Sequence, residues 1–399
     1  MIFVLLSDLI HLVERNTHQR YASYTERPGK NKKEPFHKYL FEAILHYSEK
    51  TSKEQLSWYT ASMKWLRICL VFVVLFIVSV RMTQAKTPSL GIHILRPDEI
   101  SQVRQLFSAD HWDASQQIFV TIPYSLEDTE RTTEWQTFFN TAAQQNIVPI
   151  VRLTTRFENS SWQVPTRKDV VTLLESLDAY SWSQPERHII VFNEVNHAKE
   201  WGGTVAPREY ADTLAFALDW AHTQKHTYIV LPAALDLSAP QSTVSWDAYA
   251  YWQVVYREQP ELFAQLDGWN SHSYPNPAFS ASPYRTGRTS LQGFKQELAW
   301  VTQWTDKALP VYITETGWES SKSLNRYLRQ YYTYALENIW NDDRVLAVTP
   351  FLLKGDPGPF SGFSFLTGGD EPTVQYLAFQ NAMRAVCGSA CPQLISYNR

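Results

Sequence analysis

Two glutamates stand where short apolar runs end. The run at 188–193 ends in Asn193 and is followed at once by Glu194, and the run at 311–315 ends in Glu315. Two carboxyl groups can cleave an acetal when one protonates the leaving oxygen and the other attacks the anomeric carbon or activates water. One fold supports both roles when the surroundings separate the two pKa values. The sequence therefore predicts Glu194 and Glu315 as a catalytic pair. The alternative is that each is an exposed loop residue or half of an ion pair.

Eight apolar runs alternate with longer amphipathic stretches from residue 87 onward. Short runs rich in Val, Ile and aromatic residues are typical of parallel strands buried on both faces. The amphipathic pattern predicts helices at 132–145, 168–177, 207–223 and 325–340. This alternation predicts an α/β fold, a (β/α)8 TIM barrel. A doubly wound sheet is the alternative, but no Gly-rich phosphate loop follows the first strand. The predicted strands are 90–95, 118–124, 148–153, 188–193, 228–233, 266–273, 311–315 and 345–353.

In such a barrel the carboxyl ends of all strands meet at one face, where the following loops build the active site. Glu194 and Glu315 end the fourth and seventh predicted strands, and no other predicted strand ends in Glu. The segments 274–288 and 355–370 are rich in Pro, Gly and Ser and follow the sixth and eighth strands. We expect both segments to border the site.

Asn-Glu at strand four and Glu-Thr-Gly-Trp at strand seven resemble the clan of retaining (β/α)8 glycoside hydrolases, which includes cellulase-like and β-xylosidase-like families. The resemblance covers residues 87 to about 386 and leaves the family within the clan open. It implies that Glu194 is the acid/base, that Glu315 is the nucleophile and that Asn193 holds the sugar 2-hydroxyl. A retaining mechanism then requires the two carboxyl groups about 5–5.5 Å apart.

Further site residues are predicted beside this pair. His272 and Tyr274 resemble the His-x-Tyr pair of several clan families, in which the Tyr donates a hydrogen bond to the nucleophile. Alternation along a strand places both side chains on one side. Arg152, on the third strand, is expected to keep the nucleophile charged. Trp318, just after Glu315, is expected to stack on a sugar ring, with Trp201, Trp269 and Phe351 as weaker candidates.

Three positions depart from the pattern of the clan. Several families keep an Arg at the end of strand two, but the run 120–124 has none. Strand eight often supplies a Trp platform, and here it supplies only Phe351. Val195 stands where some cellulase families have a Pro. Because of these departures, the sequence does not predict which sugar or linkage is cleaved. Nor does it predict whether cleavage occurs within a glycan chain or at its ends.

Two other functions compete with hydrolysis by the carboxylate pair. A barrel could bind a surface glycan without cleaving it, but such a protein has no reason to keep both glutamates. A metal-dependent hydrolase would assemble His93, His197 and His272 with a carboxylate. These positions lack a local ligand motif such as His-x-His, so we expect no metal and no other cofactor.

The composition limits the class of partner. With 44% hydrophobic residues among 399, the chain can bury a large core, which excludes wholesale disorder. A net charge of −4 argues against a protein that binds nucleic acid by neutralising phosphates. The 15 Trp and 21 Tyr suit a sugar-binding cleft as well as a core. The expected partner is an oligo- or polysaccharide.

The N-terminal part differs from the rest of the chain. The thirteen residues 68–80 carry no charge, fewer than the roughly 20 that a membrane-spanning helix needs. A basic leader at 63–67 and the small residue Ala85 favour a signal peptide over 63–86, with a signal anchor as the alternative. A buried core helix is a third interpretation.

The other predicted boundaries of the chain depend on how the segment 63–86 is interpreted. Residues 1–62 are then a cytoplasmic tail or lie upstream of the true start at Met63, and residues 387–399 form a C-terminal tail. The domain 87–386 is expected to be secreted or extracytoplasmic, free or attached to a membrane through 68–80. Cys387 and Cys391 could form a local disulfide or remain two thiols.

Overall fold

The computed structural model describes residues 89–107, 116–182 and 184–387. The predicted N-terminal extension, the signal peptide or anchor, and Cys391 lie outside these residues. No helix in the described ranges is both long enough and apolar enough to cross a bilayer.

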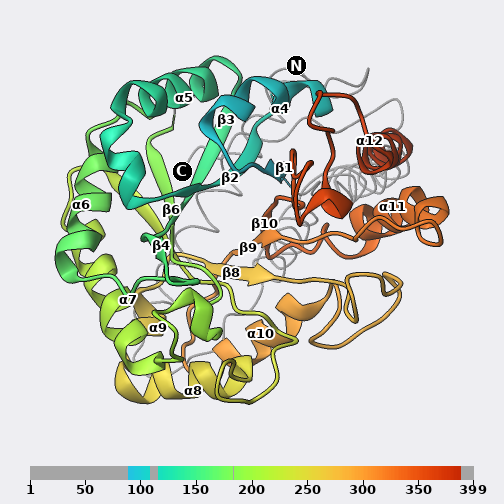
Figure 1. Cartoon of the computed structure of the whole chain (residues 1–399). Coiled ribbons are helices and arrows are strands. Elements are labelled where there is room, and N and C mark those ends of the chain that lie inside the picture. The colour runs from blue at the N-terminus through green and yellow to red at the C-terminus, as the bar shows by residue number, and fades with distance from the viewer. Residues whose placement is uncertain (1–88, 108–115, 183, 388–399) are drawn as a thin grey trace, which may run out of the picture. The chain divides into compact units, whose positions relative to one another are not determined.

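Eight parallel strands form the centre of the barrel, and helices surround them (Figure 1). Their order in the sheet is β7-β6-β3-β2-β1-β10-β9-β8. Each βα unit therefore places its strand beside the preceding one, and β10 returns to pair with β1. The predicted (β/α)8 fold is confirmed. The strands are β1 (Ser89–His93), β2 (Ile118–Tyr124), β3 (Ile147–Leu153), β6 (Glu186–Val191), β7 (Thr227–Pro232), β8 (Trp269–His272), β9 (Val311–Glu315) and β10 (Val345–Val348).

The seam between β7 and β8 is joined differently from the other strand pairs. Here the described residues form no continuous ladder. The backbone amide of Asp267 donates to the carbonyl oxygen of Val230 at 3.3 Å, and Asp236 forms a single parallel bridge with His272. The barrel is therefore nearly closed, with its least bonded junction beside the strand that carries His272.

The predicted helices are confirmed, the last one as a short 3-10 turn followed by an α-helix. Local capping explains where α6 begins: the side chain of Thr166 accepts from the amide of Asp169, and the Asp169 carboxylate accepts from the amide of Thr166. The α-helices are α4 (Ile100–Leu106), α5 (Thr132–Gln144), α6 (Arg167–Asp178), α7 (Pro207–His222), α8 (Ala248–Glu258), α9 (Leu262–Gln265), α10 (Gly293–Val301), α11 (Leu328–Asn338) and α12 (Val374–Cys387). The 3-10 turns are η1 (Pro97–Glu99), η2 (Leu126–Glu130), η3 (Ala198–Glu200), η4 (Asn325–Tyr327) and η5 (Ser361–Phe363).

Side chains fill the interior of the barrel below the site. Phe119, Ile150, Ile190 and Leu231 belong to one buried cluster contributed by successive strands. His188 packs in the same region, and burial lowers its pKa to about 4, so its ring is neutral near pH 7. Because this interior is packed, a substrate can enter only at an end of the barrel.

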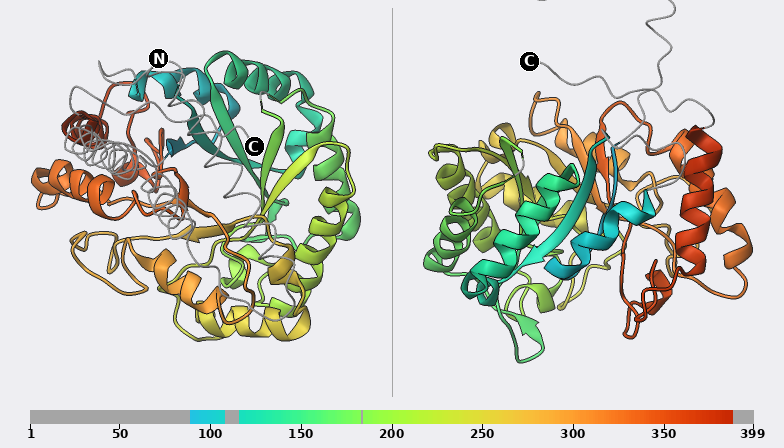
Figure 2. Two further views of the ribbon diagram at one scale, coloured as in Figure 1. Left: turned by 180° about the vertical axis from the view of Figure 1, so that it is seen from behind. Right: turned by 90° about the horizontal axis from the view of Figure 1, so that it is seen from above.

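A short hairpin that the sequence pattern did not predict follows β3. It consists of β4 (Phe157–Glu158) and β5 (Ser161–Trp162), and the two turn residues between them have positive φ angles. The hairpin and the segment 355–370 project from the same side of the barrel (Figure 2). The strand ends that precede them lie at that same face.

Candidate active site

The chain turns sharply at the end of β6. Phe192 and Glu194 have φ angles of 71° and 34°, in the left-handed region that residues other than glycine rarely adopt. The amide of Glu194 is held by the carbonyl oxygen of Ala234 at 3.0 Å, which helps to stabilise the turn. Backbone strain of this kind costs about 1–3 kcal/mol per residue and clusters at functional sites. Here it lets Asn193 reach Arg152 on β3 and Glu194 reach β8.

Glu315 ends β9 and lies among donors from other strands. Arg152 Nη1 donates to its Oε1, and Tyr274 Oη donates to its Oε2 at 3.1 Å. His93 Nε2 lies 3.5 Å from Oε1, and His272 Nδ1 lies 3.8 Å from Oε2. The side chain is only 11% exposed. Both oxygens of this carboxylate are therefore occupied by positive or hydrogen-bonding partners.

Glu194 has a sparser environment. His272 Nδ1 lies 2.9 Å from its Oε1, and its side chain is 21% exposed. One oxygen of Glu194, one of Glu315 and a ring nitrogen of His272 all lie within 4.8 Å of one another. The two carboxylates, which follow β6 and end β9 with β7 and β8 between them in the sequence, thus lie close enough to act on a single bond.

The charges of the site are set by burial and by close pairs. Burial alone would raise the pKa of Glu315, but the positive charges of His272 and Arg152 lower it well below its usual range. Burial lowers the pKa of His93 to about 3, so His93 is neutral and adds no charge near pH 7. Burial also opposes a charge on His272, yet the carboxylates of Glu315 and Glu194 raise its pKa. Arg152 and His272 therefore balance an ionised Glu315.

Glu200, the last residue of η3, is a third carboxylate of the site, and the sequence pattern did not predict it. Asn193 Nδ2 donates to Glu200 Oε2 at 3.4 Å. Burial, and then the negative charge of Glu194, raise the pKa of Glu200. Its only sequence signal is proximity to Glu194 in a segment with no strand pattern. A residue that enters the site from a loop is not found by looking at strand ends.

The predicted sugar contact of Trp318 is wrong. Its ring is fully buried, its Nε1 donates to the carbonyl oxygen of Ala281 at 2.8 Å, and it packs against Tyr331 and Tyr332. Gly317, with a φ angle of 121°, turns the chain between Glu315 and Trp318. A ring without an exposed face cannot stack on a sugar.

The weaker aromatic candidates are corrected for the same reason. Trp201 is fully buried between Phe192 and Tyr210, and Trp269 is fully buried against other core rings. Phe351 differs from them, because its ring meets that of His93 edge-on at 5.1 Å. It is 7% exposed, so it supports the site from the side of β10 and presents little surface to a ligand.

The donor atoms of the site suit hydrogen bonding better than a metal ion. Glu194, His272 and Glu315 are close enough to share an ion. However, Arg152 and Tyr274 already donate to both oxygens of Glu315, and a guanidinium repels a dication. His197, one of the three histidines considered from the sequence, pairs with a carboxylate outside this cluster, since its Nε2 lies 3.0 Å from Asp236 Oδ2.

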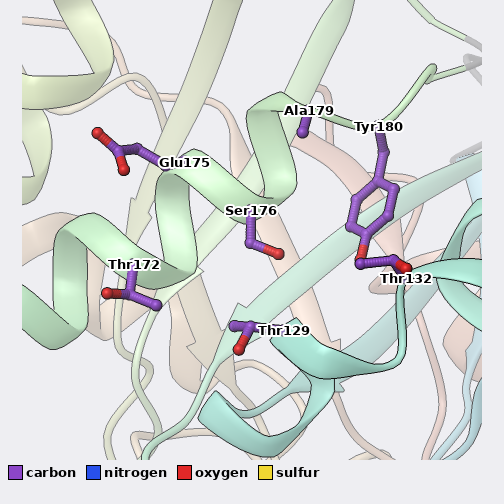
Figure 3. A pocket seen from close by; sticks show the side chains of 7 residues that line it. All are labelled: Thr129, Thr132, Thr172, Glu175, Ser176, Ala179 and Tyr180. Atoms are coloured by element: carbon purple, nitrogen blue, oxygen red, sulfur yellow. The ribbon is translucent and has the colours of Figure 1, made fainter.

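A pocket of about 440 Å³ lies between α6 and the segment 129–132 (Figure 3). Glu175 is the single carboxylate of its lining, so this pocket offers no acid/base pair. It contains none of the predicted site residues. Its lining residues are Thr129, Thr132, Thr172, Glu175, Ser176, Ala179 and Tyr180.

Comparison of structures relates the barrel to solved glycoside hydrolases. A GH5_18 protein from Streptomyces cattleya, in complex with GlcNAc, matches with a TM-score of 0.53 and 16% identity over 77% of this chain and 82% of its own. An endo-β-1,4-glucanase from Xanthomonas axonopodis pv. citri matches with a TM-score of 0.51 and 12% identity over 75% and 99%. The barrel has the fold of these glycoside hydrolases.

A third solved structure extends this comparison. A GH5_18 variant from Bifidobacterium longum subsp. longum, in complex with Manβ1-4GlcNAc, matches with a TM-score of 0.51 and 12% identity over 77% of this chain and 80% of its own. No family model matches the sequence, and no curated protein does. The resemblance to barrel glycoside hydrolases is therefore confirmed in the fold, with the family within the clan unresolved.

Proposed function

We propose that the domain 87–386 is a retaining glycoside hydrolase that cleaves β-linked O-glycosidic bonds. The observation that carries this proposal is the approach of Glu194 and Glu315 within 4.8 Å, with donors gathered around Glu315. A short distance between the carboxylates is the arrangement of retaining enzymes, since inverting enzymes need about 6.5–9.5 Å to admit a water.

In the first step, Glu315 attacks the anomeric carbon while the bond to the leaving oxygen breaks. Glu194 gives its proton to that oxygen, and a covalent glycosyl ester of Glu315 forms. Arg152 and Tyr274 hold the attacking carboxylate in place and keep it ionised until the neutral ester forms, when the negative charge of the pair is on Glu194. His272 orients Glu194 through their 2.9 Å contact.

In the second step, the ionised Glu194 takes a proton from water, and the resulting hydroxide attacks the anomeric carbon. The ester bond to Glu315 breaks, its carboxylate is restored, and Glu194 is protonated for the next turnover. Two inversions at the same carbon leave the product with the configuration of the substrate. Asn193, whose Oδ1 accepts from Arg152 Nη1 at 2.9 Å, is proposed to contact the sugar 2-hydroxyl.

The substrate is proposed to be an oligo- or polysaccharide of the cell envelope or the extracellular space. The structures with GlcNAc and Manβ1-4GlcNAc bound to barrels of this fold support a glycan ligand. The extracytoplasmic setting, free or attached through residues 68–80, rests on the N-terminal sequence pattern. Those residues lie outside the described part of the chain.

Trapping the covalent intermediate tests the mechanism. The full chain is screened with aryl β-glycosides and soluble β-glycans, and then incubated with the 2-deoxy-2-fluoro counterpart of the best aryl glycoside. We expect the mass of one sugar to be added to the peptide that contains Glu315, and none to be added in Glu315→Gln. Turnover with inversion, or labelling of another residue, would contradict the proposal.

A further inference from the structure

Glu200 is a buried carboxylate that the proposed mechanism does not use. Its side chain is 9% exposed. Lys199 Nζ lies 3.6 Å from Glu200 Oε1, but Lys199 is 65% exposed, so solvent screens this pair. The other oxygen of Glu200 accepts from Asn193 Nδ2 at 3.4 Å. Burying a carboxylate is costly unless it is paired, and the partner inside the site is the Asn193 amide.

The Asn193 amide lies between two groups of opposite hydrogen-bonding character. Arg152 Nη1, which can only donate, lies 2.9 Å from Asn193 Oδ1. An ionised carboxylate can only accept, so Glu200 selects the Nδ2 end. An asparagine amide is otherwise free to turn by 180° and exchange its donor and acceptor. Together Arg152 and Glu200 leave one orientation of Asn193, in which the second Nδ2 hydrogen is available to a ligand.

The charges around Glu200 come from three segments. Glu194 follows β6, Lys199 lies on η3 and Arg152 lies on β3. The carboxylate of Glu194 raises the proton affinity of Glu200 in addition to burial, whereas Lys199 and Arg152 oppose this effect. As the pH falls, Glu200 therefore takes up a proton earlier than an exposed Glu. It then no longer acts only as an acceptor toward Asn193.

We propose that Glu200 is a positioning residue that acts through the Asn193 amide to set how the site binds the substituent at C2 of the sugar. This inference rests on the proposed function, in which Asn193 contacts the 2-hydroxyl. Glu200 itself need not touch the substrate. Its removal should therefore affect substrates with a 2-hydroxyl and spare those without one.

The test compares two substrates in four proteins. The substrates are the 2,4-dinitrophenyl β-glycoside that the wild type hydrolyses fastest and its 2-deoxy counterpart. The proteins are the wild type, Glu200→Ala, Glu200→Gln and the matched control Glu209→Gln. Glu209 is an exposed carboxylate that accepts from the ring nitrogen of Trp201 at 3.4 Å, on the helix that follows η3.

We expect Glu200→Ala to lower kcat/KM for the 2-hydroxy substrate by about 10-fold and for the 2-deoxy substrate by less than about 2-fold. Glu200→Gln keeps an oxygen that can accept from Asn193, so its loss should be smaller. Glu209→Gln should match the wild type on both substrates. An equal loss on both substrates in Glu200→Ala and Glu200→Gln would overturn the inference and leave the proposed function standing. No turnover of any β-glycoside by the wild type would overturn both.

Discussion

The carboxyl ends of β6 and β9 each present one glutamate to the same space, but in different surroundings. Glu315 receives hydrogen bonds from Arg152 and Tyr274, and its side chain is 11% exposed. Glu194 contacts His272 at one oxygen and is 21% exposed. The backbone also differs, because only the end of β6 has non-glycine residues in the left-handed region.

In the proposed mechanism, this difference separates Glu315, whose charge must be constant, from Glu194, whose charge must change. A nucleophile is useful only when ionised, and the donors around Glu315 stabilise that form. An acid that later acts as a base must gain and lose a proton, so fixed positive partners at both oxygens would hinder it. The two glutamates lie near the carboxyl ends of their strands, and the neighbouring strands give them the different partners that the two proposed roles need.

Removing the proposed nucleophile should have the largest effect. Glu315→Ala is expected to lower kcat on the order of 10⁵-fold for every β-glycoside, because no other group can form the covalent ester. The measurement is initial-rate kinetics on substrates with good and poor leaving groups. Glu319→Gln, which changes an exposed carboxylate on the same loop, should retain full activity. Substantial turnover by Glu315→Ala would assign the nucleophile elsewhere.

The second-largest effect should depend on the leaving group. Glu194→Ala is expected to lose about 10³-fold on glycosides whose leaving oxygen needs a proton, and to form the covalent ester normally from dinitrophenyl glycosides. The ester should then accumulate, because the second step lacks its base. Added azide, which needs no base, should restore turnover and yield a β-glycosyl azide. An α-azide would reverse the two roles.

Arg152→Met should remove the strongest hydrogen-bonding partner of the nucleophile. We expect kcat/KM at neutral pH to fall by about 100-fold, since a buried charged group loses its partner. The pKa of Glu315 is held low in part by Arg152, so its loss should raise this pKa. The acidic limb of kcat/KM should therefore move to higher pH. Arg156→Met, at an exposed position after the same strand, is the control. If the acidic limb of kcat/KM did not move in Arg152→Met, Arg152 would not be the group that keeps Glu315 ionised.

Tyr274→Phe should have the smallest of these effects. It removes one hydrogen bond to Glu315 Oε2 and leaves Arg152 at the other oxygen, so we expect a loss of about 10-fold in kcat. Tyr284→Phe, at an exposed tyrosine in the loop that follows Tyr274, provides the comparison. If Tyr274→Phe reduced activity as much as Arg152→Met, the two oxygens of Glu315 would be equally dependent on their donors.

Much of the fold could be predicted from the sequence. The eight buried strands show as apolar runs because both of their faces are covered, and a residue pattern can report burial. Their ends were less certain: β8 covers four residues, whereas the pattern marked 266–273. The β4–β5 hairpin was missed because its two-residue strands are too short to establish a period. Trp201, Trp269 and Trp318 were predicted to face a sugar but are buried. The sequence shows that a ring is apolar, but not which way it faces.

Site residues near the carboxyl ends of strands could be predicted from the sequence, whereas those in loops could not. Glu194, Glu315 and His272 meet because parallel strands bring their carboxyl ends to one face. Arg152 was expected to hold the nucleophile charged, and it does donate to Glu315. Glu200 comes from a loop, and only the folded chain shows that it reaches Asn193. Loop geometry depends on tertiary contacts that one sequence does not display.

The nearly closed seam between β7 and β8 affects how the strand of His272 is held. On its other side β8 pairs with β9, and from outside the barrel Ser271 donates to Glu297 of α10, while Ser273 Oγ accepts from the amide of Phe294 at 2.9 Å. The β2–β3 ladder, by contrast, runs through seven residue pairs. Amide hydrogens of β7 and β8 that face the seam should therefore exchange with deuterium sooner than those between β2 and β3. The histidine that contacts both carboxylates would then belong to the part of the barrel wall that opens first.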